Sequence, residues 1–237
     1  DHRTSALVYY YMSDEKASSE STSNMNAIPK RYQGLSARLT YGFRDTYMID
    51  LNFGYTGSEN FQPGRRFGFF PSVALGWVPT QYEFMKNAKW LNFLKIRASY
   101  GTVGNDRIAN KRFPYLTIVN RGSNSPWGST SQETLIESYI GADNLEWEVA
   151  TKFDLGIEGK LFDNRIDFVV DFFNDVRSGI YQRRVQVPSY VGLTSMPFSN
   201  VGEMRSYGAD GNISYTERLT KDLSLTLRGN FTYSKND

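Results

Sequence analysis

The feature that most constrains this chain is a strict alternation of apolar and polar residues over long segments. In 35–43, Leu, Ala, Leu, Tyr and Phe alternate with Ser, Arg, Thr and Gly, and after a polar turn at 44–46 the alternation resumes over 47–55. A period of two residues indicates strands with one apolar and one polar face, and two such segments around a tight turn indicate a hairpin. The chain is therefore predicted to be all-β.

The alternation recurs along most of the chain, in segments that are long for a soluble protein. Counting them predicts about nine strands of roughly 8–13 residues. A soluble strand averages about 5–6 residues, whereas a strand that crosses a bilayer needs about 9–11. Segment length therefore favours strands that cross a membrane. The segments beyond the first hairpin are 147–161, 166–172, 209–215 and 223–233, with less regular ones at 4–12, 67–77 and 94–100.

Along the chain, short connections between these segments alternate with long ones. This predicts antiparallel strands with short turns on one side and long loops on the other, the organisation of an outer-membrane barrel. The stretch 78–93, which contains Glu83–Lys86, is predicted to form a short helical turn on the short-turn side, and 131–138 is a weaker helical candidate inside a long loop. The short turns are near 44–46, 163–164 and 217–222, and the long polar stretches are 13–32, 56–66, 102–144 and 177–206.

Alternation alone does not separate a membrane barrel from a soluble β-sandwich. The polar face carries charges such as Arg38, Asp50, Arg97 and Asp171, which a wet lumen tolerates, although the outer face of a sandwich would too. Aromatic residues make up 15% of the chain and gather near strand ends, where lipid headgroups favour amphipathic rings. These features favour the barrel. The odd strand number would leave bare edges in lipid, which predicts that the chain is part of a larger wall.

Composition excludes several classes of function. The chain has no cysteine and its one histidine is His2, which excludes disulfides and histidine-cluster metal sites and argues against a Ser-His-Asp triad. A net charge of +2, from 27 basic and 25 acidic side chains, is too balanced for a nucleic-acid-binding protein. The carboxylates Asp143, Glu146 and Glu148 would suit a glycosidase pair, but charged strand starts at a barrel rim explain them better. We expect no enzyme, no metal, no cofactor and no nucleic-acid partner.

Several stretches that interrupt the alternation resemble one protein family, SusC/RagA TonB-dependent outer-membrane transporters. The resemblance runs over about 28–235, and the stretches follow one another at the family's spacing. One departure is Pro79–Gln81, where the family usually has a Ser-Glu-Glu-like start to the short helix, so the helix boundary is open. The stretches are 28–35 (IPKRYQGL), 54–61 (GYTGSENF), 66–77 (RFGFFPSVALGW), 90–91 (WL), 94–101 (LKIRASYG), 104–106 (GND), 144–148 (NLEWE) and 154–158 (DLGIE).

The resemblance implies a protein much larger than this chain. It would have an N-terminal plug, a barrel of about 22 strands, a SusD-like surface lipoprotein as lid, and a connection to TonB through the N-terminal region. Residues 1–237 would be part of the barrel domain, without the plug and the remaining strands. The implied function is nutrient import, of glycans or peptides, through the lipid of the outer membrane of a Gram-negative, Bacteroidetes-like bacterium.

Four aromatic residues in the long polar segments are candidate contact residues, namely Trp127, Tyr139, Tyr181 and Tyr190. Rings in such loops stack on ligands such as sugars or pack on a partner, and we expect contacts with cargo or lid there. They can equally pin a loop to itself. The rival interpretation of the whole chain is a soluble all-β ligand-binding module with long aromatic loops. It requires the apolar strand faces to be buried against a second sheet.

Overall fold

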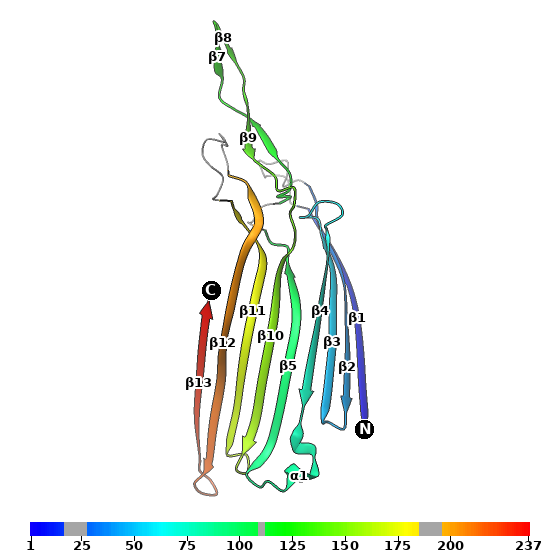
Figure 1. Cartoon of the computed structure of the whole chain (residues 1–237), viewed down its shortest axis with the longest axis vertical. Helices are drawn as coiled ribbons and strands as arrows, with labels where there is room; N and C mark the ends of the chain where they lie inside the picture. Colours follow the sequence, from blue (N-terminus) through cyan, green and yellow to red (C-terminus); the bar gives the residue numbers. More distant parts are fainter. Residues whose placement is uncertain (17–27, 109–111, 185–195) are drawn as a thin grey trace.

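The computed structural model describes residues 1–16, 28–108, 112–184 and 196–237. Nine strands form one antiparallel sheet in the order β1-β2-β3-β4-β5-β10-β11-β12-β13, and Figure 1 shows them standing side by side. The prediction of an all-β wall of about nine strands is confirmed. The strands are β1 (His2–Glu15), β2 (Lys30–Phe43), β3 (Tyr47–Ser58), β4 (Phe67–Trp77), β5 (Leu91–Asn105), β10 (Glu148–Leu161), β11 (Ile166–Arg183), β12 (Phe198–Arg218) and β13 (Ser224–Asn236).

The two ends of the sheet differ as the alternating connections predict. Short turns and the helix α1 (Glu83–Lys86), preceded by the 3-10 turn η1 (Pro79–Gln81), lie at one end, and the long loops lie at the other (Figure 1). Two of the turns place side-chain-bearing residues in the left-handed region, with φ of 51° and 53° at Arg44 and Asp45 and of 53° at Phe162. The helical turn expected in 78–93 is confirmed. We call the two ends the turn end and the loop end.

Two sequence-based boundaries need correction. Residues 131–138 were expected as a weak helical candidate, but the structure has strand residues there: β8 (Thr130–Gln132) and β9 (Leu135–Tyr139) pair with β7 (Ser125–Trp127) and β6 (Ile118–Arg121). Pairing across the loop outweighs the weak local preference. The polar stretch 177–206 is also shorter than predicted, because β11 and β12 extend into it. The pairing register shifts around Ile180, so the alternation there breaks although the strand continues.

The sheet has one apolar face, and no second sheet of the described residues covers it. Leu51 on β3 is 45% exposed, Leu75 on β4 is 52% exposed and Phe231 on β13 is 52% exposed. The two other sheets of the described chain are two-stranded, β6–β9 and β7–β8, and Figure 1 shows them beyond the loop end. A soluble sandwich would need a second sheet packed on the apolar face, and the described residues contain no such sheet. No helix among the described residues is both long and apolar enough to cross a membrane.

The opposite face is polar and carries ion pairs between neighbouring strands. Arg97 on β5 contacts Glu158 on β10 at 2.9 Å and Asp171 on β11 at 2.7 Å. On β2 and β3, Arg38 pairs with Asp50. This charged face matches the lumen lining that the alternation predicts. Further pairs on it are Lys95–Glu158 at 3.6 Å, Lys152–Asp175 at 3.2 Å and Lys160–Asp167 at 3.6 Å.

Candidate functional site

The buried apolar cluster of the described residues lies at the loop end of the sheet. Phe61 and Leu145 are 0% exposed, and Ile108 and Ala142 complete the cluster. Phe61 comes from the β3–β4 connection, Ile108 follows β5, and the other two precede β10. Burying a side chain of this size contributes about 1.5–3 kcal/mol. We call this cluster and the loops that form it the loop platform.

Aromatic rings extend the platform towards the sheet. Trp147 stacks on Phe61 with ring centroids 4.8 Å apart, and it meets Phe70 of β4 edge-on at 5.3 Å. Aromatic pairs in these geometries contribute about 0.5–1.5 kcal/mol beyond their buried area. The platform is thus packed onto the strands as well as within itself.

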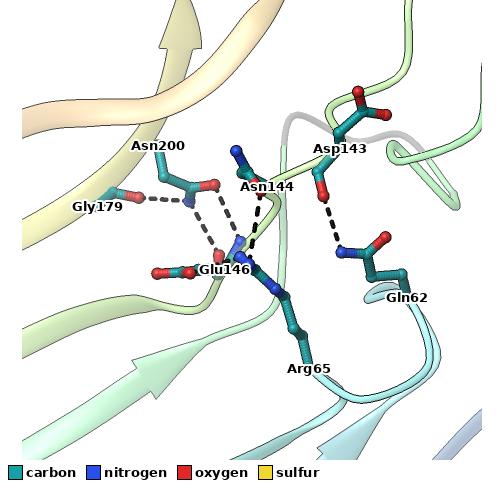
Figure 2. A network of polar contacts seen from close by, with 7 residues as sticks. All are labelled: Gln62, Arg65, Asp143, Asn144, Glu146, Gly179 and Asn200. Carbon is teal, nitrogen blue, oxygen red and sulfur yellow. Dashed lines mark hydrogen bonds and ion pairs between the residues drawn. The ribbon is translucent and has the colours of Figure 1, made fainter.

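Polar contacts join the β3–β4 connection to the segment before β10 (Figure 2). Arg65 Nη1 donates to Glu146 Oε1 at 2.5 Å, and Arg65 Nη2 donates to Asn144 Oδ1 at 3.5 Å. Gln62 Nε2 donates to the backbone oxygen of Asp143 at 2.8 Å. Of the carboxylates that sequence alone would allow as a glycosidase pair, Glu146 thus pairs with Arg65 and Glu148 pairs with Arg177 at 3.3 Å, whereas Asp143 makes its contact through its backbone oxygen.

Asn200 on β12 fastens the same segment from the other side (Figure 2). Its Nδ2 donates to the backbone oxygens of Glu146 at 2.9 Å and Gly179 at 2.7 Å, while its Oδ1 accepts from the backbone N–H of Glu146 at 3.1 Å. Gly179 has φ of 67°, a conformation that favours glycine. One side chain therefore links β11, β12 and the segment before β10.

Two of the predicted contact residues are part of this packing. Tyr139 is 5% exposed, and its hydroxyl donates to the backbone oxygen of Pro114 at 3.0 Å and lies 2.6 Å from the hydroxyl of Tyr181. Tyr181 in turn stacks on Phe198 with centroids 5.3 Å apart. In this arrangement both tyrosines pin the loop to the sheet, which is the alternative that the sequence left open. Contact of these two residues with cargo or lid stays a prediction.

Trp127 lies elsewhere, at the tip of an arm. It ends β7, next to Gly128 with φ of 63°, and it is 78% exposed. Figure 1 shows β7 and β8 as the part of the chain farthest from the turn end. We call residues 118–139, which form β6–β9, the loop arm. Tyr190 falls in 185–195 and lies outside the described residues.

Two hollows beside the platform share Arg31, Glu59 and Arg66, which sequence reasoning did not single out. The first, of about 350 Å³, also has Tyr32 in its lining, and the second, of about 250 Å³, also has Tyr115. Arg66 pairs with Glu59 at 3.7 Å, and Arg31 pairs with Asp14 at 3.4 Å. Guanidinium groups beside aromatic rings, as in these hollows, suit the binding of a polar ligand. The sequence does hold one indication of these residues, since all three lie in or beside stretches that interrupt the alternation.

No group of three or more His, Cys, Asp or Glu residues that could hold a metal ion occurs in the described part of the chain. The arrangement at the loop end consists of a packed platform, charged hollows and an exposed arm. Its hydrogen bonds and ion pairs position loops relative to one another.

Comparison with known proteins identifies this architecture. The TonB-dependent receptor P3 of Formosa agariphila is 29% identical over 84% of this chain, and the TonB-dependent receptor SusC of Bacteroides thetaiotaomicron is 28% identical, also over 84%. These matches cover 19% and 20% of the two relatives, so the chain spans about a fifth of their length.

Solved structures and a family model agree with these relatives. The RagAB peptide transporter superposes on 100% of this chain with a TM-score of 0.78 at 25% identity, over 28% of its own chain. The siderophore receptor PirA of Pseudomonas aeruginosa shares the fold, with a TM-score of 0.58 at 16% identity over 99% of this chain and 39% of its own. The family model for the TonB-dependent receptor-like β-barrel matches residues 2–237. The chain, similar to SusC and RagAB as its sequence motifs predicted, belongs to the TonB-dependent receptor β-barrel family.

Proposed function

We propose that this chain is part of the barrel wall of a TonB-dependent importer in the outer membrane of a Gram-negative bacterium. The observation that carries the proposal is the division of one sheet into an exposed apolar face and an ion-paired polar face. Lipid solvates the first face and the wet lumen solvates the second. The family assignment supports the same architecture.

The sheet edges support a larger barrel, of which residues 1–237 form part. Among the described residues, strands β1 and β13 each pair on one side only. An unpaired strand edge in lipid costs several kcal/mol for each bare backbone group, so further strands must pair with both. A plug and the region that contacts TonB would belong to other parts of the same protein, as the resemblance implies.

The proposed cargo is a glycan or a peptide, taken up together with a SusD-like surface lipoprotein. Similarity to SusC and to RagAB, a peptide transporter, supports this pairing of cargo and lid. Cargo would bind where the loop platform, plug and lid meet, and would cross the lumen after the plug rearranges under the action of TonB. This wall would supply lipid-facing rings, a polar lining and positioned loops.

Fractionation of the source cells tests the proposal. A blot with an antibody against 121–135 should detect a band far above 27.1 kDa in the outer membrane, and the band should shift when the sample is not heated. A water-soluble band near 27 kDa would contradict the proposal and favour a free-standing binding module. A lipoprotein that copurifies with the large species would support the proposed lid.

A further inference from the structure

A hollow of about 530 Å³ lies at the turn end of the sheet, away from the loop platform. It is formed by the connection between α1 and β5, the β10–β11 turn, the start of β11 and the end of β12. The turn Phe162–Arg165 is held to the α1–β5 connection, because Phe162 N–H donates to the backbone oxygen of Trp90 at 2.9 Å. The lining residues are Lys89, Trp90, Phe162, Asp163, Arg165, Ile166 and Tyr215.

The hollow belongs to the apolar side of the sheet. Ile166 and Tyr215 are register partners, and two residues further along the same strands Phe168 pairs with Ile213. Side chains two residues apart share a face, so the hollow continues into this apolar strip. In a barrel with periplasmic turns, that place is where the headgroups of the periplasmic leaflet meet the protein.

The lining combines aromatic walls with the ammonium group of one exposed lysine. Trp90 is 56% exposed and Phe162 is 50% exposed. Two cations, Lys89 and Arg165, are matched by two carboxylates, Asp163 in the lining and Glu217, which accepts from the Tyr215 hydroxyl at 2.8 Å. Arg165 pairs with Glu217 at 3.1 Å, while the exposed Lys89 has no ion-pair partner among the described residues. Its ammonium group is therefore available to an anion.

The backbone of the turn fixes the position of the Phe162 ring. Phe162 has φ of 53°, and an aromatic residue pays a steric cost in the left-handed region. Asp163 and Asn164, with φ of 57° and 62°, are residue types that tolerate it better. Here the cost places an exposed ring on the wall of the hollow.

We propose that this hollow binds the phosphate-bearing headgroup of a phospholipid from the periplasmic leaflet. The phosphate would lie near Lys89, between the rings of Trp90 and Phe162, and an acyl chain would follow the strip of Phe168 and Ile213. Continuity with the apolar face selects a membrane lipid over a free anion. The inference rests on the proposed membrane location and adds a specific site to it.

Native mass spectrometry of the full-length receptor, delipidated in detergent, tests this site. The probes are palmitoyl-oleoyl phosphatidylglycerol and the diacylglycerol with the same acyl chains. We expect preferential retention of the phospholipid, with a loss of about fivefold in affinity for Lys89→Gln, since a basic side chain near an anionic lipid surface contributes ~1 kcal/mol. Lys86→Gln is the matched control, because Lys86 lies on the same rim but does not line the hollow.

Three results would overturn the proposal: equal retention of the two lipids, equal losses in the two lysine variants, or full displacement of the phospholipid by millimolar inorganic phosphate. The last result would indicate a site for free anions. Trp90→Phe should retain the phospholipid better than Trp90→Ala, because it keeps an aromatic wall. Failure of the membrane proposal itself would show separately, as a purified protein whose electrophoretic mobility is unchanged by heating.

Discussion

Arg97 lies across Gly156 on the polar face of the sheet. A Cβ atom at Gly156 would lie 2.7 Å from Arg97 Nε and closer still to a carboxylate oxygen of Asp171. Because Gly156 has no side chain, the guanidinium of Arg97 can lie over it and pair with both Glu158 and Asp171. Gly229 on the apolar face offers a contrast, since the nearest side-chain atom to its Cβ position is 3.8 Å away, on Ile213.

This difference predicts that the same substitution costs more stability at Gly156 than at Gly229. Gly156→Leu should displace Arg97 and lower the free energy of unfolding of the full-length barrel by about 1–3 kcal/mol, the usual cost of overpacking. Gly229→Leu should cost little because its space is open. Unfolding by urea in detergent micelles, followed by heat-dependent gel mobility, measures both. Equal free energies of unfolding for the two variants would contradict the view that Arg97 needs the space above Gly156.

Asn200 carries a second residue-scale prediction, for the loop platform. Asn200→Ala removes three hydrogen bonds to Glu146 and Gly179 and should cost about 1–3 kcal/mol locally. Amide hydrogen exchange should speed up in 142–147 and stay slow in the central strands. Ser199→Ala is the control, since Ser199 Oγ has no hydrogen-bond partner among the described residues. Faster exchange throughout the sheet would instead indicate that Asn200 supports the whole wall.

The loop arm is the element on which a contact with the lid or cargo can be tested. Deleting 123–135 should reduce lid association or uptake while leaving barrel insertion intact, because the arm extends beyond the nine-stranded sheet (Figure 1). Copurification of the surface lipoprotein and heat-dependent mobility are the two measurements. Trp127→Ala should reproduce part of the loss, since Trp127 is the exposed ring at the tip. Unchanged lid binding and unchanged uptake would remove the functional claim for this arm.

At the scale of elements, the sequence predicts best where a strand has one wet and one apolar face. The regular segments 35–43 and 47–55 lie within β2 and β3, because their side chains follow the period of two. Prediction fails where partners distant in sequence decide the conformation, as at 131–138, which pairs with other loop residues, and around Ile180, where a register shift interrupts the pattern.

The candidate site was less predictable than the fold for the same reason. Tyr139 and Tyr181 are both loop aromatics by sequence, and only their meeting across 42 positions shows that they pin the loop. Arg31, Glu59 and Arg66 come from separate segments and have no local pattern. Their shared hollows appear only once β2, β3 and β4 are paired.

At the scale of the whole molecule, the sheet depends on its surroundings. Residues 1–237 expressed alone should not give a stable water-soluble monomer, because the apolar face and both edge strands would meet water. Aggregation in aqueous buffer, measured by size-exclusion chromatography, is the expected result, and the full-length protein refolded in detergent is the control. A monodisperse species of 27.1 kDa with slowly exchanging strand amides would contradict this.

The loop platform also has a consequence for assembly. Arg65 and Glu146 are 81 positions apart in sequence, and Asn200 is 54 positions from Glu146. Contacts between residues so far apart in sequence form late, after the strands between them have paired. A slip of one residue between β5 and β10 would turn the side chains to the wrong face and separate these partners. The contacts of the loop platform therefore form only when the strands of the sheet are paired in the correct register. Their formation is then the last step of correct assembly.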